Sequence, residues 1–329
     1  MIKTENNFDI LRLMLAVLVF MMHWNSLTQQ NISNQIFHMG EYAVDVFFIV
    51  SGFLIFWSFD NDSNKKHFYI KRFFRIFPLY AILIILQTVF FIIYSEGSVG
   101  EIVKYFISNI FFLNFLSPSV GNTLSGLARD TLNGSLWTLK NEVLFYIFIP
   151  VLFFYLKRFG LRFLLFLYAL SVAYMVISNS LGHEKLLVLF PGQLRLFLVG
   201  IMLYVLFDKI NKSNIYLLMP ISLLLIILLR DNQYFDFSVY PILLGIVVIF
   251  VVYYLPVIKI KFDFSYSFYI LHYPIIQLSM YFGVNSNHPF FSFITLFCMI
   301  LFLSYLSEIY IEKRFIQIAK DIIKGRYLR

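Results

Sequence analysis

Long apolar stretches constrain this 329-residue chain more than any other feature of its sequence. Each is about seventeen residues or longer, the length at which a helix can cross the hydrocarbon core of a membrane. Backbone groups in lipid must be satisfied within one segment or in a closed barrel, so such runs predict helices. We therefore expect an all-α polytopic membrane protein with about ten transmembrane helices. The expected spans are 8–27, 41–59, 75–95, 136–156, 161–179, 187–207, 214–230, 238–256, 264–282 and 290–311.

The composition excludes a soluble domain, since 60% of the residues are hydrophobic and only 13% are charged. Cys298 is the only cysteine and lies inside an apolar run, so neither an internal disulfide nor a thiol metal site is expected. Residues 102–116 form a shorter stretch that contains Lys104 and Asn109. This stretch indicates an interfacial or re-entrant piece rather than a span.

The distribution of Lys and Arg predicts the orientation of the chain in the membrane. If the N-terminus is cytoplasmic, most of the 26 basic residues fall on the inner side. The six that remain for the outer half are Lys104, Arg129, Lys140, Lys185, Arg195 and Arg230. This asymmetry predicts that both termini are cytoplasmic. We expect one integral-membrane domain over residues 1–329, with a basic cytoplasmic tail at 312–329 on the anionic inner leaflet.

Two ionisable residues interrupt the first span. Arg12 and His23 are eleven residues apart, almost three helical turns, so they share one helix face about 16 Å apart along the axis. Ionisable groups at such depth are costly and rarely point at lipid. We therefore expect this face to line a polar passage.

Depth along the predicted helices places three titratable side chains in one layer near the outer surface. His23 and Asp45 lie about 6 Å from the estimated outer ends of their spans, and Glu142 lies about 9 Å deep. A carboxylate that accepts one ring N–H of His23 would fix its tautomer and raise its basicity, as a general base for a hydroxyl requires. The sequence leaves open which carboxylate is the partner, and each residue alone could serve only structure.

A basic group at the inner side precedes the third span. Arg72 and Arg75 follow Lys71 and share a helix face if the helix has begun there. Guanidinium groups suit phosphates, although a positive-inside anchor explains them equally. One hypothesis joins these charges to those of the first helix: a phosphate-bearing donor binds at the inner face, and its pantetheine arm runs along the face from Arg12 to His23.

At these residues the chain resembles the membrane acyltransferase family 3, whose members transfer acyl groups, usually acetyl, to extracytoplasmic glycans. The matching pieces are Arg12 and His23 with ten residues between them, VDVFFIVSGFL from Val44, RFFRIFP from Arg72, SLWTL from Ser135, EVLFY from Glu142, Arg195 before Gly200, SYSFY from Ser265 ahead of His272, and IEK from Ile311. They occur in the order typical of the family and cover nearly the whole chain.

The resemblance implies roles for particular residues. It implies that His23 is the catalytic base or acyl carrier, and Asp45 and Glu142 match acids of the family's motifs, so that one of them is expected to orient and charge-balance His23 in the catalytic site. It further implies that Arg12, Arg72 and Arg75 bind the donor, acetyl-CoA or another acyl-CoA, and it implies no metal. Two departures, Lys140 and Asn141 before Glu142 and the lack of an acidic residue after Arg195, concern the acceptor site. His272 could line the donor channel or make a structural hydrogen bond.

The expected function is transfer of an acyl group, acetyl above all, from cytoplasmic acyl-CoA to a hydroxyl of an extracytoplasmic glycan or lipid-linked saccharide. The expected location is a bacterial cytoplasmic membrane, with membrane lipids as neighbours and no nucleic-acid partner. The alternative is a transporter or flippase of a small anion or lipid-linked sugar, in which the same buried charges bind cargo or relay protons. A third reading, a polysaccharide polymerase, predicts a larger outward loop.

Overall fold

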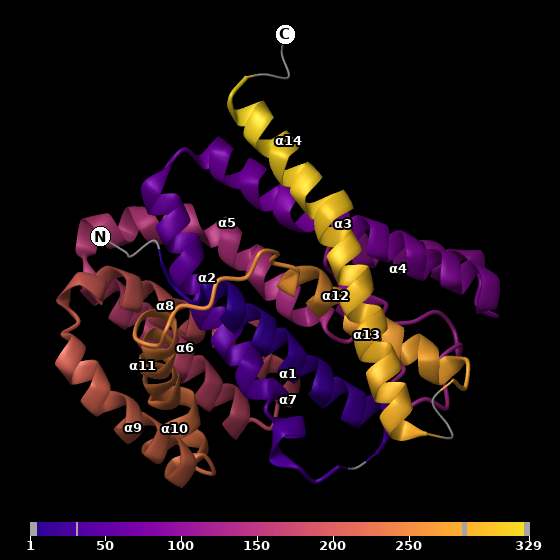
Figure 1. Ribbon diagram of the computed structural model, residues 1–329, viewed down its shortest axis with the longest axis horizontal. Coiled ribbons are helices and arrows are strands. Elements are labelled where there is room, and N and C mark those ends of the chain that lie inside the picture. The colour runs from indigo at the N-terminus through magenta and orange to yellow at the C-terminus, as the bar shows by residue number, and fades with distance from the viewer. Residues whose placement is uncertain (1–4, 31, 285–287, 326–329) are drawn as a thin grey trace. The chain divides into compact units, whose positions relative to one another are not determined.

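The computed structural model describes residues 5–30, 32–284 and 288–325. Within these ranges the regular structure is helical and no strand occurs (Figure 1). The α-helices are α1 Phe8–Thr28, α2 Gly40–Asn61, α3 Lys65–Tyr94, α4 Val99–Ile110, α5 Leu136–Phe159, α6 Leu161–Ser180, α7 Glu184–Leu187, α8 Phe190–Leu206, α9 Lys212–Leu229, α10 Gln233–Ser238, α11 Tyr240–Tyr253, α12 Ser265–Tyr281, α13 Pro289–Ser307 and α14 Lys313–Ile323.

Eight helices of the described chain are long and apolar enough to cross a membrane, which confirms the all-α polytopic prediction. The expected spans 238–256 and 264–282 form shorter helices, α11 with 14 residues and α12 with 17. At about 1.5 Å per residue, α11 is about 21 Å long and falls short of a core about 30 Å thick. The count of about ten therefore corresponds to eight full-length spans and these two shorter helices.

The stretch expected to be interfacial or re-entrant, 102–116, overlaps α4, which runs from Val99 to Ile110 and whose 12 residues are too few to span. A capping box starts this helix: Glu101 N–H donates to Ser98 Oγ at 3.3 Å, and the Ser98 N–H donates to the Glu101 carboxylate at 2.8 Å. Of the expected tail 312–329, Glu312 is the last residue of a π turn, residues 313–323 form α14, and residues 326–329 lie outside the described residues.

The chain divides into two compact units, each assembled from separate stretches of sequence. Unit 1 comprises Met1–Arg12, Val44–Phe68 and Asn141–Ile260, and unit 2 comprises Leu13–Ala43, Tyr69–Lys140 and Lys261–Arg329. Four of the five boundaries fall within helices α1, α2, α3 and α5, so each of these helices contributes residues to both units, and the fifth lies in the connection between α11 and α12.

In unit 1 the backbones of α2 and α8 touch where two glycines face each other. A Cβ added at Gly52 would lie 2.1 Å from the carbonyl oxygen of Phe197, and one added at Gly200 would lie 2.1 Å from the carbonyl oxygen of Ile49. Without a strong hydrophobic drive between helices in lipid, close approach through small residues is a main source of association. The two glycines therefore hold α2 against α8.

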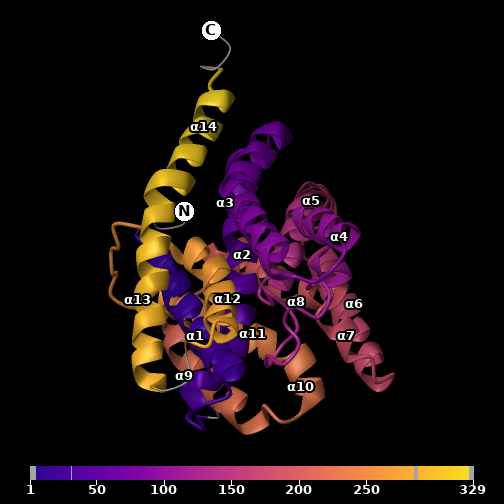
Figure 2. The same cartoon turned by 90° about the vertical axis from the view of Figure 1, so that its right-hand side faces the viewer.

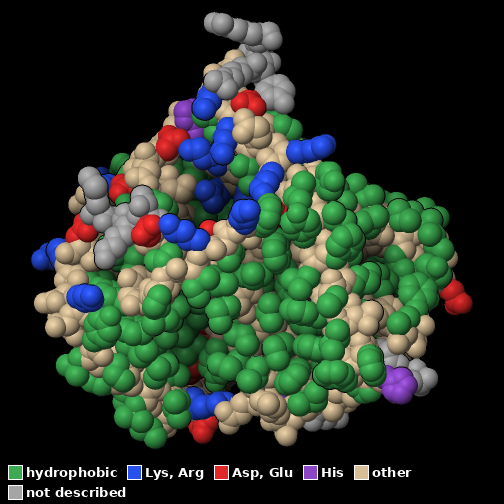
Figure 3. All heavy atoms as spheres, in the orientation of Figure 1, with side chains coloured by type: hydrophobic (Ala, Val, Ile, Leu, Met, Phe, Trp, Pro, Cys, Tyr) green, Lys and Arg blue, Asp and Glu red, His purple; other side chains and the backbone are tan. Residues whose placement is uncertain are grey.

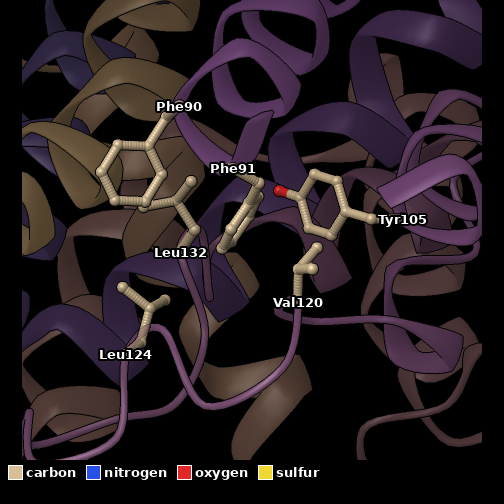
Figure 4. Packing of buried hydrophobic residues seen from close by; sticks show 6 residues of the cluster. All are labelled: Phe90, Phe91, Tyr105, Val120, Leu124 and Leu132. Atoms are coloured by element: carbon tan, nitrogen blue, oxygen red, sulfur yellow. The ribbon is translucent and has the colours of Figure 1, made fainter. Parts of the chain in front are cut away.

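In unit 2 the connection between α4 and α5 is packed rather than loose. Val120, Leu124 and Leu132 from this connection form a buried cluster with Tyr105 of α4 and with two phenylalanines, Phe90 and Phe91, of α3 (Figure 4). The hydroxyl of Tyr105 donates to Gln87 Oε1 at 2.8 Å, and its burial raises the pKa of the phenol. This cluster fixes the connection on α3 and α4.

The last helices of unit 2 form one continuous rod. A π turn, Glu308–Glu312, joins α13 to α14 without a break (Figure 2). Helix α12 packs alongside α13. Hydrophobic side chains make up most of the face seen in Figure 3. On α3, a stripe at helical spacing is exposed, as expected for a helix that faces lipid: Ile82, Ile85, Leu86, Val89 and Ile93.

Gly52→Ala or Gly200→Ala should destabilise the protein by about 1 to 3 kcal/mol, because a methyl group at either position meets backbone that cannot rotate away. Thermal unfolding in detergent measures the effect. Gly100→Ala is the matched control, since its Cβ would meet only Ser98 Oγ at 3.8 Å. Equal melting temperatures for Gly52→Ala and Gly100→Ala would contradict the close crossing.

Candidate active site

Two histidines from distant parts of the sequence meet in unit 2. Helix α1 carries His23 and helix α12 carries His272, and Nδ1 of His23 lies 2.8 Å from Nε2 of His272. The rings are nearly parallel, with 22° between their planes and 5.0 Å between their centroids. His272 is fully buried, whereas His23 is partly exposed. Of the two residues, His23 is the more exposed.

The connection before α5 packs against α12 beside this pair. Asn133 Nδ2 donates to the carbonyl of Ile270 at 3.1 Å, and Gln277 Nε2 donates to the carbonyl of Arg129 at 2.6 Å. A Cβ on Gly134 would lie 2.7 Å from the ring of Tyr273, so this glycine lets the connection lie flat on that ring. These contacts attach the connection to the helix that carries His272.

An aromatic ring and a cation complete the surroundings of His23. The ring of Tyr273 stands edge-on to it, with centroids 4.9 Å apart and 72° between the planes. Arg129 is exposed, and its positive charge interacts electrostatically with both His23 and Tyr273. A base within the electrostatic field of a cation is an arrangement that supports attack on a carbonyl, because the carbonyl oxygen becomes negative.

The ring partner of His23 differs from the one expected. Depth along the helices suggested that Asp45 or Glu142 accepts a ring N–H, but the hydrogen bond of His23 Nδ1 is to another imidazole. Depth along a helix axis does not reveal the direction in which a side chain points around that axis, and this direction decides which helix it meets. The partner is His272. The sequence left open whether His272 lines the donor channel or makes a structural hydrogen bond.

The two predicted carboxylates bond tyrosines within unit 1. Asp45 accepts a hydrogen bond from the hydroxyl of Tyr240 at 3.0 Å. Glu142 accepts one from the hydroxyl of Tyr146, one turn further along α5, and one from Ser51 Oγ at 3.4 Å. These bonds connect α2 to α11 and to α5. The catalytic role of Asp45 and Glu142 stays a prediction.

Arg75 lies between two carboxylates in unit 2. Its Nη1 is 3.0 Å from Glu312 Oε2, and its Nη2 is 3.0 Å from Asp263 Oδ2. The Glu312 side chain is only 1% exposed, so the guanidinium neutralises a buried charge. Arg72 lies one turn earlier on α3, which begins at Lys65, so both arginines are helical as the spacing required. Donor binding by Arg72 and Arg75 stays a prediction, and at Arg75 a phosphate would compete with Glu312 and Asp263.

Arg12 borders a pocket of about 560 Å³ in unit 1. Its Nη2 donates to Asp9 Oδ1 at 2.6 Å, and across the pocket Lys259 Nζ donates to Glu5 Oε1 at 2.8 Å. The hydrogen bond and charge of Lys259 lower the pKa of the Glu5 carboxyl. Trp57 adds an aromatic wall. The sequence did not predict this pocket, because Lys259 lies in a connection far from Arg12.

Two further cations contact a backbone carbonyl and an aromatic ring. Arg195 is buried on α8, where its side-chain Nη1 donates to the carbonyl of Gly192 at 2.8 Å. Its backbone N–H donates to Ser171 Oγ at 3.0 Å. Lys140 lies over the ring of Phe115, 4.8 Å from its centroid. The backbone of Arg195 thus joins α8 to α6, whereas the guanidinium of Arg195 bonds within α8.

Comparison with known proteins gives concordant matches. A family model described as an acyltransferase domain matches residues 5–309. The O-acetyl transferase of Shigella phage Sf6 is 30% identical over 329 residues, covering 95% of this chain and 96% of that protein. Nodulation protein 10 of Rhizobium leguminosarum bv. viciae is 32% identical over 162 residues, and the match covers 45% of this chain and 44% of that protein. No solved structure matches.

Arg75→Ala should lower the stability of the folded protein by roughly 3 kcal/mol, because it leaves the buried Glu312 carboxylate without its cation. The double change Arg75→Ala, Glu312→Ala should recover part of this loss, since it removes the stranded charge as well. Thermal unfolding of the single and double variants in detergent tests this. Normal stability of Arg75→Ala, together with a raised KM for donor, would favour a phosphate-binding role instead.

Proposed function

This chain belongs to the acyltransferase family whose model covers residues 5–309 and is a multi-pass membrane O-acyltransferase, and we propose that it acetylates a hydroxyl of an extracytoplasmic glycan. The donor is acetyl-CoA, and the acceptor is a glycan or a lipid-linked saccharide at the outer face of a bacterial cytoplasmic membrane. The observation that carries this proposal is the partly exposed imidazole of His23, paired with His272, in a chain similar along nearly its whole length to an O-acetyl transferase.

His23 supplies the base that the reaction needs. A sugar hydroxyl is a weak nucleophile until a base takes its proton as the oxygen attacks the thioester carbonyl. The new C–O bond forms, the C–S bond breaks, and the thiolate of CoA leaves and takes up a proton. In the alternative route His23 attacks first and carries the acetyl group before the sugar hydroxyl accepts it. Both routes need an unprotonated ring nitrogen on His23.

The pocket beside Arg12 supports the donor assignment. Arg12 and Lys259 supply cations for phosphates, and Trp57 supplies a ring on which an adenine can stack. Asp9 and Glu5 bond these two cations. Donor phosphates would therefore replace carboxylates, an exchange of one anion for another. Along α1, Arg12 and His23 are separated by about 16 Å, a length suited to a pantetheine arm.

The proposed orientation follows from the charge distribution. Both termini lie in the cytoplasm, where most Lys and Arg residues fall, and the connection between α4 and α5 faces outward. In this orientation the end of α1 that carries Arg12 is cytoplasmic and the end that carries His23 is near the outer surface. Donor and acceptor thus reach opposite ends of the same helix, as transfer across a membrane requires.

His23→Gln should lower acceptor-dependent acetyl transfer by about 10²- to 10⁴-fold, because no base or carrier remains. Membranes are supplied with radiolabelled acetyl-CoA, and both free CoA and acetylated glycan are measured. His38→Gln is the matched control, since His38 is an exposed histidine of the same unit. Undiminished transfer by His23→Gln would overturn the assignment, and cargo movement without CoA release would favour a transporter.

Arg12→Ala should raise the KM for acetyl-CoA roughly tenfold and leave kcat nearly unchanged, because it removes a charge-assisted hydrogen bond to a phosphate rather than a reacting group. Donor titrations in the same membranes measure both constants. Arg158→Ala, an exposed arginine at the end of α5, serves as the control for lost positive charge. A fall in kcat with an unchanged KM would place Arg12 outside the donor site.

A further inference from the structure

The hydrogen bond between the two histidines admits two arrangements of protons. Nδ1 of His23 and Nε2 of His272 are 2.8 Å apart, so one nitrogen carries the hydrogen and the other offers its lone pair. If His23 donates, its hydrogen is on Nδ1 and its Nε2 is a bare lone pair. If His272 donates, His23 carries its hydrogen on Nε2, and that nitrogen cannot act as a base.

The far side of the His272 ring decides between the two arrangements. Its Nδ1 adjoins the ring carbon nearest the backbone, is buried, and makes no standard hydrogen bond. The acceptors that interact with this imidazole are the backbone carbonyls of Phe268 and Tyr269, one turn earlier on α12. A lone pair directed at carbonyl oxygens is repelled, whereas an N–H is attracted. The hydrogen of His272 therefore belongs on Nδ1, and its Nε2 accepts.

We infer that His272 is a positioning residue that holds His23 in the tautomer with hydrogen on Nδ1, so that the lone pair of His23 Nε2 faces the substrate. The difference in exposure agrees, because His272 is fully buried and His23 is partly exposed. The role in turnover rests on the proposed function of His23. The assignment of the tautomer does not, since it follows from the contacts of His272 alone.

A neutral partner suits this position in the membrane. A carboxylate that fixes a catalytic histidine brings a negative charge, and burying that charge in apolar surroundings costs several kcal/mol. An imidazole lone pair fixes the same tautomer and buries no net charge. As His23 takes a proton from the acceptor hydroxyl, its Nδ1–H becomes a stronger donor, and Nε2 of His272 stabilises the imidazolium that forms. His272 thereby orients the base and assists it without contacting substrate.

Nitrogen NMR of the full-length protein, labelled with ¹⁵N-histidine in lipid bilayers, tests the tautomer directly. Spectra of His23→Gln and His272→Gln assign the four nitrogens. We expect hydrogen on Nδ1 of both rings, and shifts typical of unprotonated nitrogen for both Nε2 atoms. Hydrogen on His23 Nε2, or a mixture of the two tautomers, would overturn the inference whether or not the enzyme is active.

Kinetics of two variants test the positioning role. His272→Gln keeps a carbonyl oxygen that can accept from His23, whereas His272→Leu keeps the bulk and loses the acceptor. We expect His272→Leu to lower kcat about hundredfold with the KM for acetyl-CoA within about twofold, and His272→Gln to restore at least about tenfold of that loss. Unchanged kcat in His272→Leu, or equal kcat in the two variants, would refute positioning.

The two arms separate failure of the inference from failure of the proposed function. If His23→Gln keeps full transfer, the proposed use of His23 is wrong, while the NMR result still decides the tautomer. If His272→Leu does not fold, as judged by its thermal unfolding in detergent, the NMR arm alone decides. His38→Gln should leave both the kinetics and the signals of the pair unchanged.

Discussion

Lipid offers no hydrogen bonds, so every polar side chain within an apolar helix must find its partner inside the protein. The contacts that organise each unit follow from this constraint. In unit 2, His23 bonds His272, and Arg75 lies between Glu312 and Asp263. In unit 1 a tyrosine hydroxyl bonds each of the two carboxylates predicted to be catalytic. Apart from the Tyr146–Glu142 bond within α5, these bonds join helices from distant parts of the sequence, whose apolar faces alone would pack in many ways.

The sequence predicted the elements better than their partners. Helix lengths, the all-α class and the family follow from long apolar runs and short motifs, which are local in sequence. The partner of His23 is 249 residues away, and the carboxylate closest to Arg75 Nη1 is 237 residues away. Such pairs depend on which face of each helix turns inward and on which helices are neighbours. A membrane helix that is hydrophobic on all faces carries little information about which face turns inward or which helices are its neighbours.

The pocket beside Arg12 is a second feature whose residues the sequence did not bring together. Arg12 was expected to line a polar passage, and it borders a pocket, but the second cation comes from a connection that no helical periodicity describes. The sequence places Lys259 on the basic inner side but does not indicate a second role for it. In the proposed enzyme both readings hold, because a basic cytoplasmic surface orients the chain and also attracts an anionic donor.

The proposed reaction requires acetyl groups to pass from acetyl-CoA on one side of the membrane to a glycan on the other, with His23 as the reacting base. The most direct measurement supplies ¹³C-acetyl-CoA to the cytoplasmic face of inverted membrane vesicles and follows the label in lumenal glycans by mass spectrometry. The account predicts labelled acetyl esters in vesicles with the wild-type protein and none above background with His23→Gln. Equal labelling in both would contradict it.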